Sequence, residues 1–118
     1  MDFPGIYQAM RQTEMNEWVG GADPELTGKI SAAIPLKYLP IDGTSQVLDF
    51  GVGIGRVALS VLKHRPALKL LLGIDIVSRM VDFCRATALG GPGELYWSHG
   101  MTRSWPPALT GIPSCAST

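Results

Sequence analysis

The residues best suited to chemistry lie in one short stretch, "VLDFGVGIG", at residues 47–55. The acid Asp49 is followed by three glycines at alternate positions, Gly51, Gly53 and Gly55. Glycine inside a regular element costs roughly 0.5–1 kcal/mol relative to alanine, so three together require a local reason. A ligand that must approach the backbone closely supplies such a reason.

The spacing of these glycines separates two kinds of nucleotide site. A dinucleotide fingerprint, G-x-G-x-x-G, would place its third glycine at position 56, where this chain has Arg56. The pattern present is instead D-x-G-x-G-x-G. A second acid, Asp75, follows twenty residues after Gly55, at the end of the apolar run "ALKLLLGID".

A helix is predicted ahead of this stretch, over residues 24–34. Asp23 is a candidate N-cap, Pro24 suits the first helical position, and Pro35 is expected to end the helix. Apolar residues recur at helical spacing and predict the buried side of an amphipathic helix: Leu26, Ile30, Ala33 and Ile34.

The rest of the chain alternates between strands and helices. Residues 46–50 and 67–77 have the apolar content of strands, and residues 94–100 form a third, weaker candidate. Helical spacing marks residues 55–65 and 78–89. Such alternation predicts an α/β fold with a parallel sheet, and ligands bind such sheets beyond the carboxyl ends of the strands. The glycines and Asp75 both fall at those ends.

The acid-plus-glycine loop, with an acid ending the next strand, resembles the class I S-adenosylmethionine-dependent methyltransferases. The resemblance implies S-adenosylmethionine as the cofactor. It also implies that the three glycines line the methionine moiety, and that Asp49 supports the loop or the cofactor ammonium.

The same resemblance assigns roles to residues after the second strand. Asp75 would bind the ribose, because two carboxylate oxygens can accept two hydrogen bonds from a cis-diol. Ile76 would pack on the adenine, and Met101 would border it. No catalytic residue can be assigned, and the acceptor is expected to be a small molecule.

The resemblance implies a Rossmann-like methyltransferase sheet with flanking helices that is incomplete, with about three strands. Residues 1–22 are interpreted as a lead-in, residues 23–102 as the cofactor-binding half-domain, and residues 103–118 as an irregular tail. Without the strand that follows in the family, residues 47–50 would expose an open edge. We therefore expect self-association or a second chain that completes the sheet.

Two other classes of function remain open at this point. One is a nucleotide- or NAD-binding module, against which the residue at position 56 argues. The other is a non-catalytic remnant or an interaction subunit, which the short sheet suggests.

Composition limits the partners. Ten basic residues balance ten acidic ones without clustering, which argues against nucleic acid as a partner. No apolar run is long enough for a membrane span, so a cytoplasmic protein is expected. The two cysteines, Cys84 and Cys115, and the two histidines lack metal-ligand spacing, so no metal site is predicted. Cys84 is expected to be a small buried residue.

Overall fold

The computed structural model describes residues 1–87 and the backbone of residues 94–99. Three strands form one parallel sheet in the order β1-β2-β3. They span Gln46–Phe50 (β1), Leu70–Asp75 (β2) and Glu94–His99 (β3). The predicted α/β class and the short parallel sheet are therefore confirmed. Met101, Cys115 and residues 103–118 lie outside the described residues.

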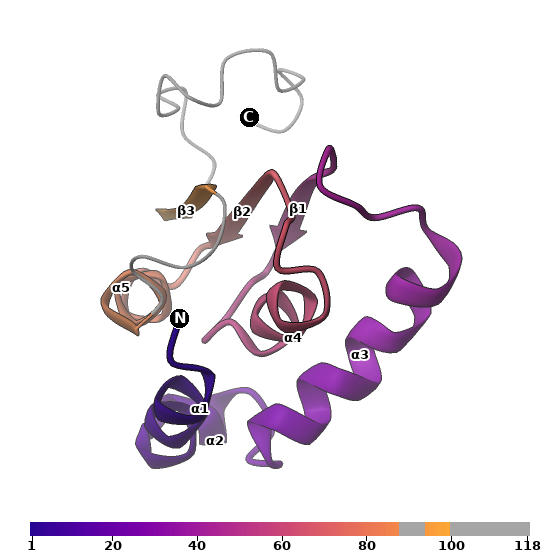
Figure 1. The fold of residues 1–118 in the computed structure, drawn as a ribbon. Coiled ribbons are helices and arrows are strands. Elements are labelled where there is room, and N and C mark those ends of the chain that lie inside the picture. Colours follow the sequence, from indigo (N-terminus) through magenta and orange to yellow (C-terminus); the bar gives the residue numbers. More distant parts are fainter. Residues whose placement is uncertain (88–93, 100–118) are drawn as a thin grey trace.

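The described part of the chain also contains five helices. They are α1 (Phe3–Gln12), α2 (Met15–Trp18), α3 (Pro24–Tyr38), α4 (Arg56–His64) and α5 (Ser78–Thr87). Figure 1 shows all five on one side of the sheet, with α4 directly beneath β1 and β2. Each of the helices α4 and α5 connects two parallel strands, which is the repeating unit of an α/β sheet.

The central strand β2 is buried along almost its whole length. On the helix side, Leu71 packs with α4 and α5, and on the opposite face Leu70, Leu72 and Ile74 pack with Leu48. The helices predicted at residues 55–65 and 78–89 are present as α4 and α5. Their core residues are Ala58, Leu59, Val61 and Leu62 in α4 and Met80, Val81 and Cys84 in α5.

The predicted orientation of α3 is wrong. The helix continues through Pro35 to Tyr38. Leu26, Ile30 and Ile34 are 56%, 64% and 69% exposed, whereas Gly28 and Ala32 are buried. A side chain at Gly28 would collide with the backbone carbonyl of Arg56. Backbone contact between α3 and α4 therefore decides which side of α3 faces inward.

Residues 1–22, interpreted from the sequence as a lead-in, contain the helices α1 and α2. Asp2 caps α1 by accepting a hydrogen bond from the Gly5 amide at 3.0 Å. The buried side of this segment joins the residues around the start of α4 and α5 in one apolar cluster: Ile6, Tyr7, Met10, Met15, Ile54, Leu59 and Met80.

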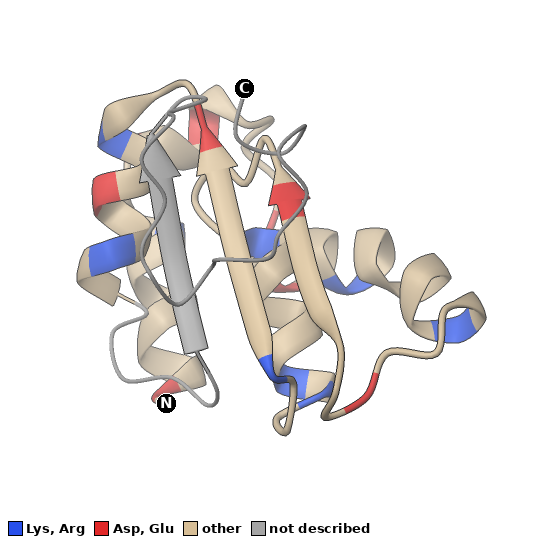
Figure 2. Ribbon diagram, turned by 90° about the horizontal axis from the view of Figure 1, so that it is seen from above, with Lys and Arg blue, Asp and Glu red and all other residues tan. Residues whose placement is uncertain are grey.

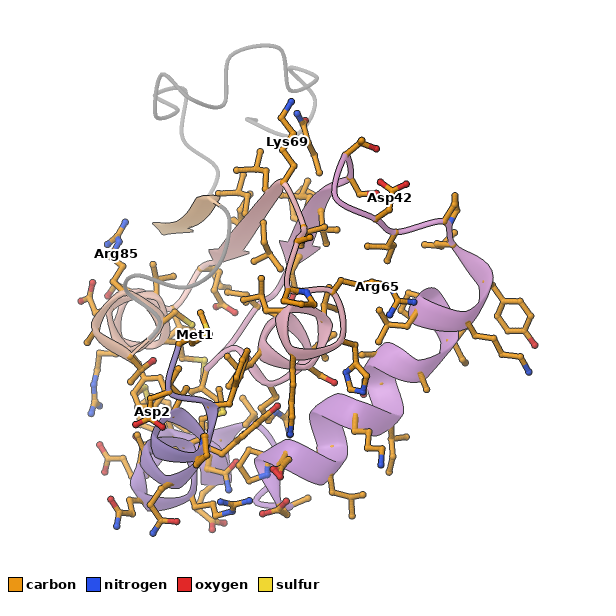
Figure 3. The ribbon with its side chains drawn as sticks, in the orientation of Figure 1. Met1, Asp2, Asp42, Arg65, Lys69 and Arg85 are labelled. Atoms are coloured by element: carbon orange, nitrogen blue, oxygen red, sulfur yellow. The ribbon has the colours of Figure 1, made fainter. Side chains whose placement is uncertain are left out.

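Arg65, which follows α4, holds the C-terminal end of α3 in place. Its guanidinium group donates to the carbonyl oxygens of Leu36 at 3.2 Å and Ile41 at 3.1 Å. Figure 3 shows Arg65 between the end of α4 and this end of α3. The chain entering β1 is thereby tied to α4.

The described residues contain neither a membrane-spanning helix nor a metal-binding cluster. None of the helices within residues 1–87 combines the length and the apolar character needed to cross a membrane. The same part of the chain holds no group of three or more side chains suited to a metal ion.

Candidate functional site

The glycine loop between β1 and α4 has the backbone that its sequence suggests. Gly51, Gly53 and Gly55 have φ values of 70°, 58° and 92°, in the left-handed region that side chains rarely adopt. The amides of Gly51 and Val52 both donate to the Ile74 carbonyl oxygen, at 2.8 and 2.9 Å. The loop is thus held against the end of β2.

The three glycines face different surroundings. A Cβ atom built on Gly53 would lie 3.6 Å from Val19 and 3.9 Å from Met80, and one on Gly55 would lie 3.4 Å from Cys84. A Cβ atom on Gly51 would meet no atom of residues 1–87 within 4 Å. Gly53 and Gly55 therefore rest on the N-terminal segment and α5, while Gly51 borders open space.

Cys84 of α5 contacts the glycine loop. Its thiol donates to the Gly53 carbonyl oxygen at 3.3 Å, and the side chain is fully buried. Burial raises the pKa of this thiol to about 12, with smaller contributions from Asp49 and Asp75. The thiolate required for nucleophilic chemistry is therefore inaccessible near neutral pH, and the role of Cys84 is structural.

Asp75 joins the end of β2 to the loop. Its two carboxylate oxygens accept from the amides of Gly53 at 2.8 Å and Val77 at 2.9 Å. Figure 2 shows acidic residues at the carboxyl ends of both β1 and β2. Each carboxylate oxygen has a second lone pair, so Asp75 keeps capacity for further donors while its orientation is fixed.

Asp49, the last but one residue of β1, is the least satisfied polar group of the site. Its Oδ2 atom is buried and has no hydrogen-bond partner among the described residues. Burial, with a smaller contribution from Asp75, raises the pKa of Asp49 to about 6. A buried carboxylate without a partner is unfavourable, so this position would gain from a cation or a hydrogen-bond donor.

Ile76 follows Asp75 directly and is 80% exposed. A large apolar side chain exposed beside the loop is typical of a ligand-binding surface, and a flat apolar group could pack on it. Phe50, at the end of β1, is also more than half exposed. Met101, the other residue assigned to this region, lies outside the described part of the chain.

Helices α1 and α2 contribute to the rim of the site, which the sequence pattern did not predict. Arg79 of α5 pairs with Glu14 at 2.6 Å and lies over the Trp18 ring at 4.9 Å, while Val19 packs beneath Gly53. The sequence does contain one signal for α1, because Asp2 followed by a proline at position 4 is typical of a helix start. These contacts attach the N-terminal segment to the rim of the site.

Comparisons with known proteins concern the fold. Neither the protein-family models nor the curated proteins contain a match to this chain. Of the solved structures that resemble it, three show the extent of the likeness. A Leishmania major SAM-dependent methyltransferase of the DUF858 family aligns with a TM-score of 0.52 and 24% identity, over 88% of this chain and 43% of its own.

The other two structures are the YcgJ protein from Bacillus subtilis and the MccD protein. YcgJ aligns with a TM-score of 0.51 and 22% identity, over 65% of this chain, and MccD with 0.50 and 21%, over 58%. The chain spans 33% and 31% of their lengths, respectively. Over the aligned part, the chain has the Rossmann-like α/β fold found in these structures, one of which is a SAM-dependent methyltransferase.

Proposed function

We propose that this chain binds S-adenosylmethionine at the glycine loop and supplies the cofactor-binding half of a methyltransferase. One observation carries the proposal: the Asp75 carboxylate, at the end of β2, lies within 2.8 Å of the Gly53 amide in the loop that ends β1. A carboxylate suited to a diol and a loop suited to close backbone approach are thus adjacent.

The surrounding residues fit the groups of the cofactor. The buried Oδ2 atom of Asp49, which no described residue satisfies, would be satisfied by the ammonium group. Gly51 leaves space beside the loop for the methionine moiety. Asp75 retains lone pairs for the ribose hydroxyls, and the exposed Ile76 would cover the adenine together with Met101.

The bound cofactor supplies a methyl group that its sulfonium already makes electrophilic. The chain's own task is to hold that group in line with the acceptor. This orientation increases the rate of methyl transfer. We propose a small molecule as the acceptor. Where the acceptor must lose a proton, a general base is also needed, and none of the described residues is assigned that role.

The proposal is tested by isothermal titration of the chain with S-adenosylhomocysteine. Asp75→Asn should weaken binding at least about tenfold, equivalent to 1.4 kcal/mol, because the amide presents one acceptor oxygen instead of two. The matched control is Asp82→Asn, since Asp82 is an exposed aspartate of α5 that pairs with Arg85. Equal affinity in both variants, with the fold intact by circular dichroism, would refute the assignment of Asp75.

The same titration with NAD separates this proposal from a dinucleotide-binding module. The loop lacks the third glycine of that fingerprint, because Arg56 occupies its position and begins α4. We therefore expect S-adenosylhomocysteine to bind and NAD not to compete with it. Competition by NAD at similar concentration would favour the dinucleotide module.

A further inference from the structure

A polar pocket of about 300 Å³ lies among the helices α1, α3 and α4. Its lining includes Tyr7 of α1, Glu25 and Lys29 near the start of α3, and Ser60 and Lys63 of α4. Figure 1 shows α1 and the start of α3 on the far side of α4 from the strands. Helix α4 therefore separates this pocket from the sheet, and neither edge of the sheet contributes to it.

Two buried hydroxyl groups line this pocket. Tyr7 and Ser60 are each only 2% exposed. Neither hydroxyl has a hydrogen-bond partner among the described residues. Burial, and to a smaller extent the nearby Glu25 carboxylate, raise the pKa of the Tyr7 phenol, so it remains protonated and able to donate. Since buried polar groups are normally hydrogen-bonded, both hydroxyls would gain from a bound molecule.

Three charged side chains at the pocket form no ion pair within the described part of the chain. They are Glu25, Lys29 and Lys63. The Lys63 ammonium group lies over the Tyr7 ring, 5.7 Å from its centroid, and this cation–π contact holds the charge at the pocket. Glu25 and Lys29 are four positions apart and so share one face of α3.

The other titratable side chains of the pocket already have partners. Asp23 accepts from the Arg11 guanidinium group at 2.7 Å and from the Leu26 amide at 3.1 Å. The Nδ1 atom of His64 donates to the Ser60 carbonyl oxygen at 2.8 Å. The unpaired charges that face a ligand are therefore two ammonium groups and one carboxylate.

We propose that this pocket binds a small acidic amino acid, a molecule with two carboxylates and one ammonium group. The carboxylates pair with Lys29 and Lys63, and the ammonium group pairs with Glu25. The hydroxyls of Tyr7 and Ser60 supply further hydrogen bonds. A dicarboxylic acid would leave Glu25 unpaired, and a neutral amino acid would leave one lysine unpaired. A volume of about 300 Å³ is at the lower end of the range for ligand pockets, which suits a small ligand.

This pocket is separate from the glycine loop. Ser60 and Lys63 lie in the second half of α4, whereas the loop precedes its first residue, Arg56. Among the described residues that line the pocket, none is assigned to the cofactor. The amino acid is therefore a ligand additional to the cofactor rather than the methyl acceptor, and the inference does not rest on the proposed function.

The test is isothermal titration of the full chain with L-glutamate, without cofactor. We expect saturable binding with a dissociation constant below about 1 mM. Glutarate lacks the ammonium group, and L-glutamine lacks the charge of the second carboxylate. Each should therefore bind at least about tenfold more weakly than L-glutamate.

Substitutions at exposed charges test the individual contacts without disturbing the buried residues. Lys29→Gln and Lys63→Gln should each weaken L-glutamate binding at least about tenfold. The matched control is Lys69→Gln, because Lys69 is an exposed lysine at the start of β2 that Figure 3 shows far from α1. Glu25→Gln should remove the preference for L-glutamate over glutarate, because it removes the partner of the ammonium group.

Three results would overturn the inference. They are the absence of saturable L-glutamate binding, equal affinity of the wild-type chain for L-glutamate and glutarate, and an equal loss of affinity in Lys69→Gln and the pocket variants. Titration of the same preparation with S-adenosylhomocysteine tests the proposed function separately. Loss of S-adenosylhomocysteine binding with intact L-glutamate binding would refute the proposed function alone.

Discussion

The Gly53 amide donates to the Asp75 carboxylate at 2.8 Å, although the two residues are 22 positions apart in the sequence. The contact exists because β1 and β2 are parallel neighbours whose carboxyl ends lie at the same edge of the sheet. It places the acid that ends β2 directly on the loop that follows β1. The chemistry of the site therefore follows from the strand order.

The first prediction concerns stability and pH. The pKa of Asp49 is about 6 in the folded chain, above the value near 3.9 expected when unfolded. The folded state therefore binds the proton more tightly, and the associated stability is present below about pH 4 and lost as pH rises through about 6. Asp49→Asn should remove this loss, which amounts to at most about 3 kcal/mol.

Urea unfolding of both proteins at several pH values measures this difference. The wild-type chain should lose stability relative to Asp49→Asn between about pH 4 and pH 7. A constant difference between the two proteins over this range would contradict the raised pKa.

A second prediction links Asp49 to the cofactor. An ammonium group interacts favourably with the ionised carboxylate, so affinity for S-adenosylhomocysteine should increase as pH rises through about 6. Titration calorimetry at pH values on either side should show the increase in the wild-type chain and not in Asp49→Asn. The same increase in the variant would exclude Asp49 as its source.

A third prediction tests the open space beside the loop. Gly51→Ala introduces a methyl group with no atom of the described part of the chain within 4 Å, at a φ of 70° that costs about 1–2 kcal/mol for a residue with a side chain. If the loop contacts the cofactor there, affinity should fall at least about tenfold. Gly20→Ala is the matched control, because Gly20 also has a positive φ, 115°, and open surroundings. A similar loss of affinity in both variants would attribute the effect to backbone strain.

A fourth prediction concerns the contact between α3 and α4. Gly28→Ala should destabilise the fold by about 3 kcal/mol, because the added methyl group collides with the Arg56 backbone rather than with a movable side chain. Ser31→Ala, on the exposed side of α3, should change stability by less than about 0.5 kcal/mol. Thermal unfolding of the wild-type chain and the two variants provides the measurement. Equal unfolding midpoints would show that the close contact between α3 and α4 does not contribute to stability.

Much of the fold could be predicted from the sequence. The apolar run ending at Asp75 and the glycines after Phe50 are local signals, and both strands lie where they were expected. The inward side of α3 could not be predicted from apolar spacing. Gly28 and Ala32 allow closer backbone approach than Leu26 and Ile30, and this close contact decides the orientation.

The candidate site, like the fold, could be predicted only in part. The positions of Asp49, Asp75 and the glycines followed from strand order, which the sequence pattern indicates. The packing of Val19 beneath Gly53 did not, because it depends on a long-range contact that no local pattern encodes. The partnerless state of Asp49 Oδ2 depends on burial in three dimensions and is visible only in the structure.

The contact of Gly28 with Arg56 has a mechanical consequence. Where two helix backbones touch, no layer of side chains lies between them to absorb a displacement, and well-packed interiors transmit strain. Arg56 directly follows Gly55, the last glycine of the loop. A shift of α3 toward α4 would therefore have to displace the backbone at the end of the glycine loop, so the position of α3 limits the conformations open to that loop.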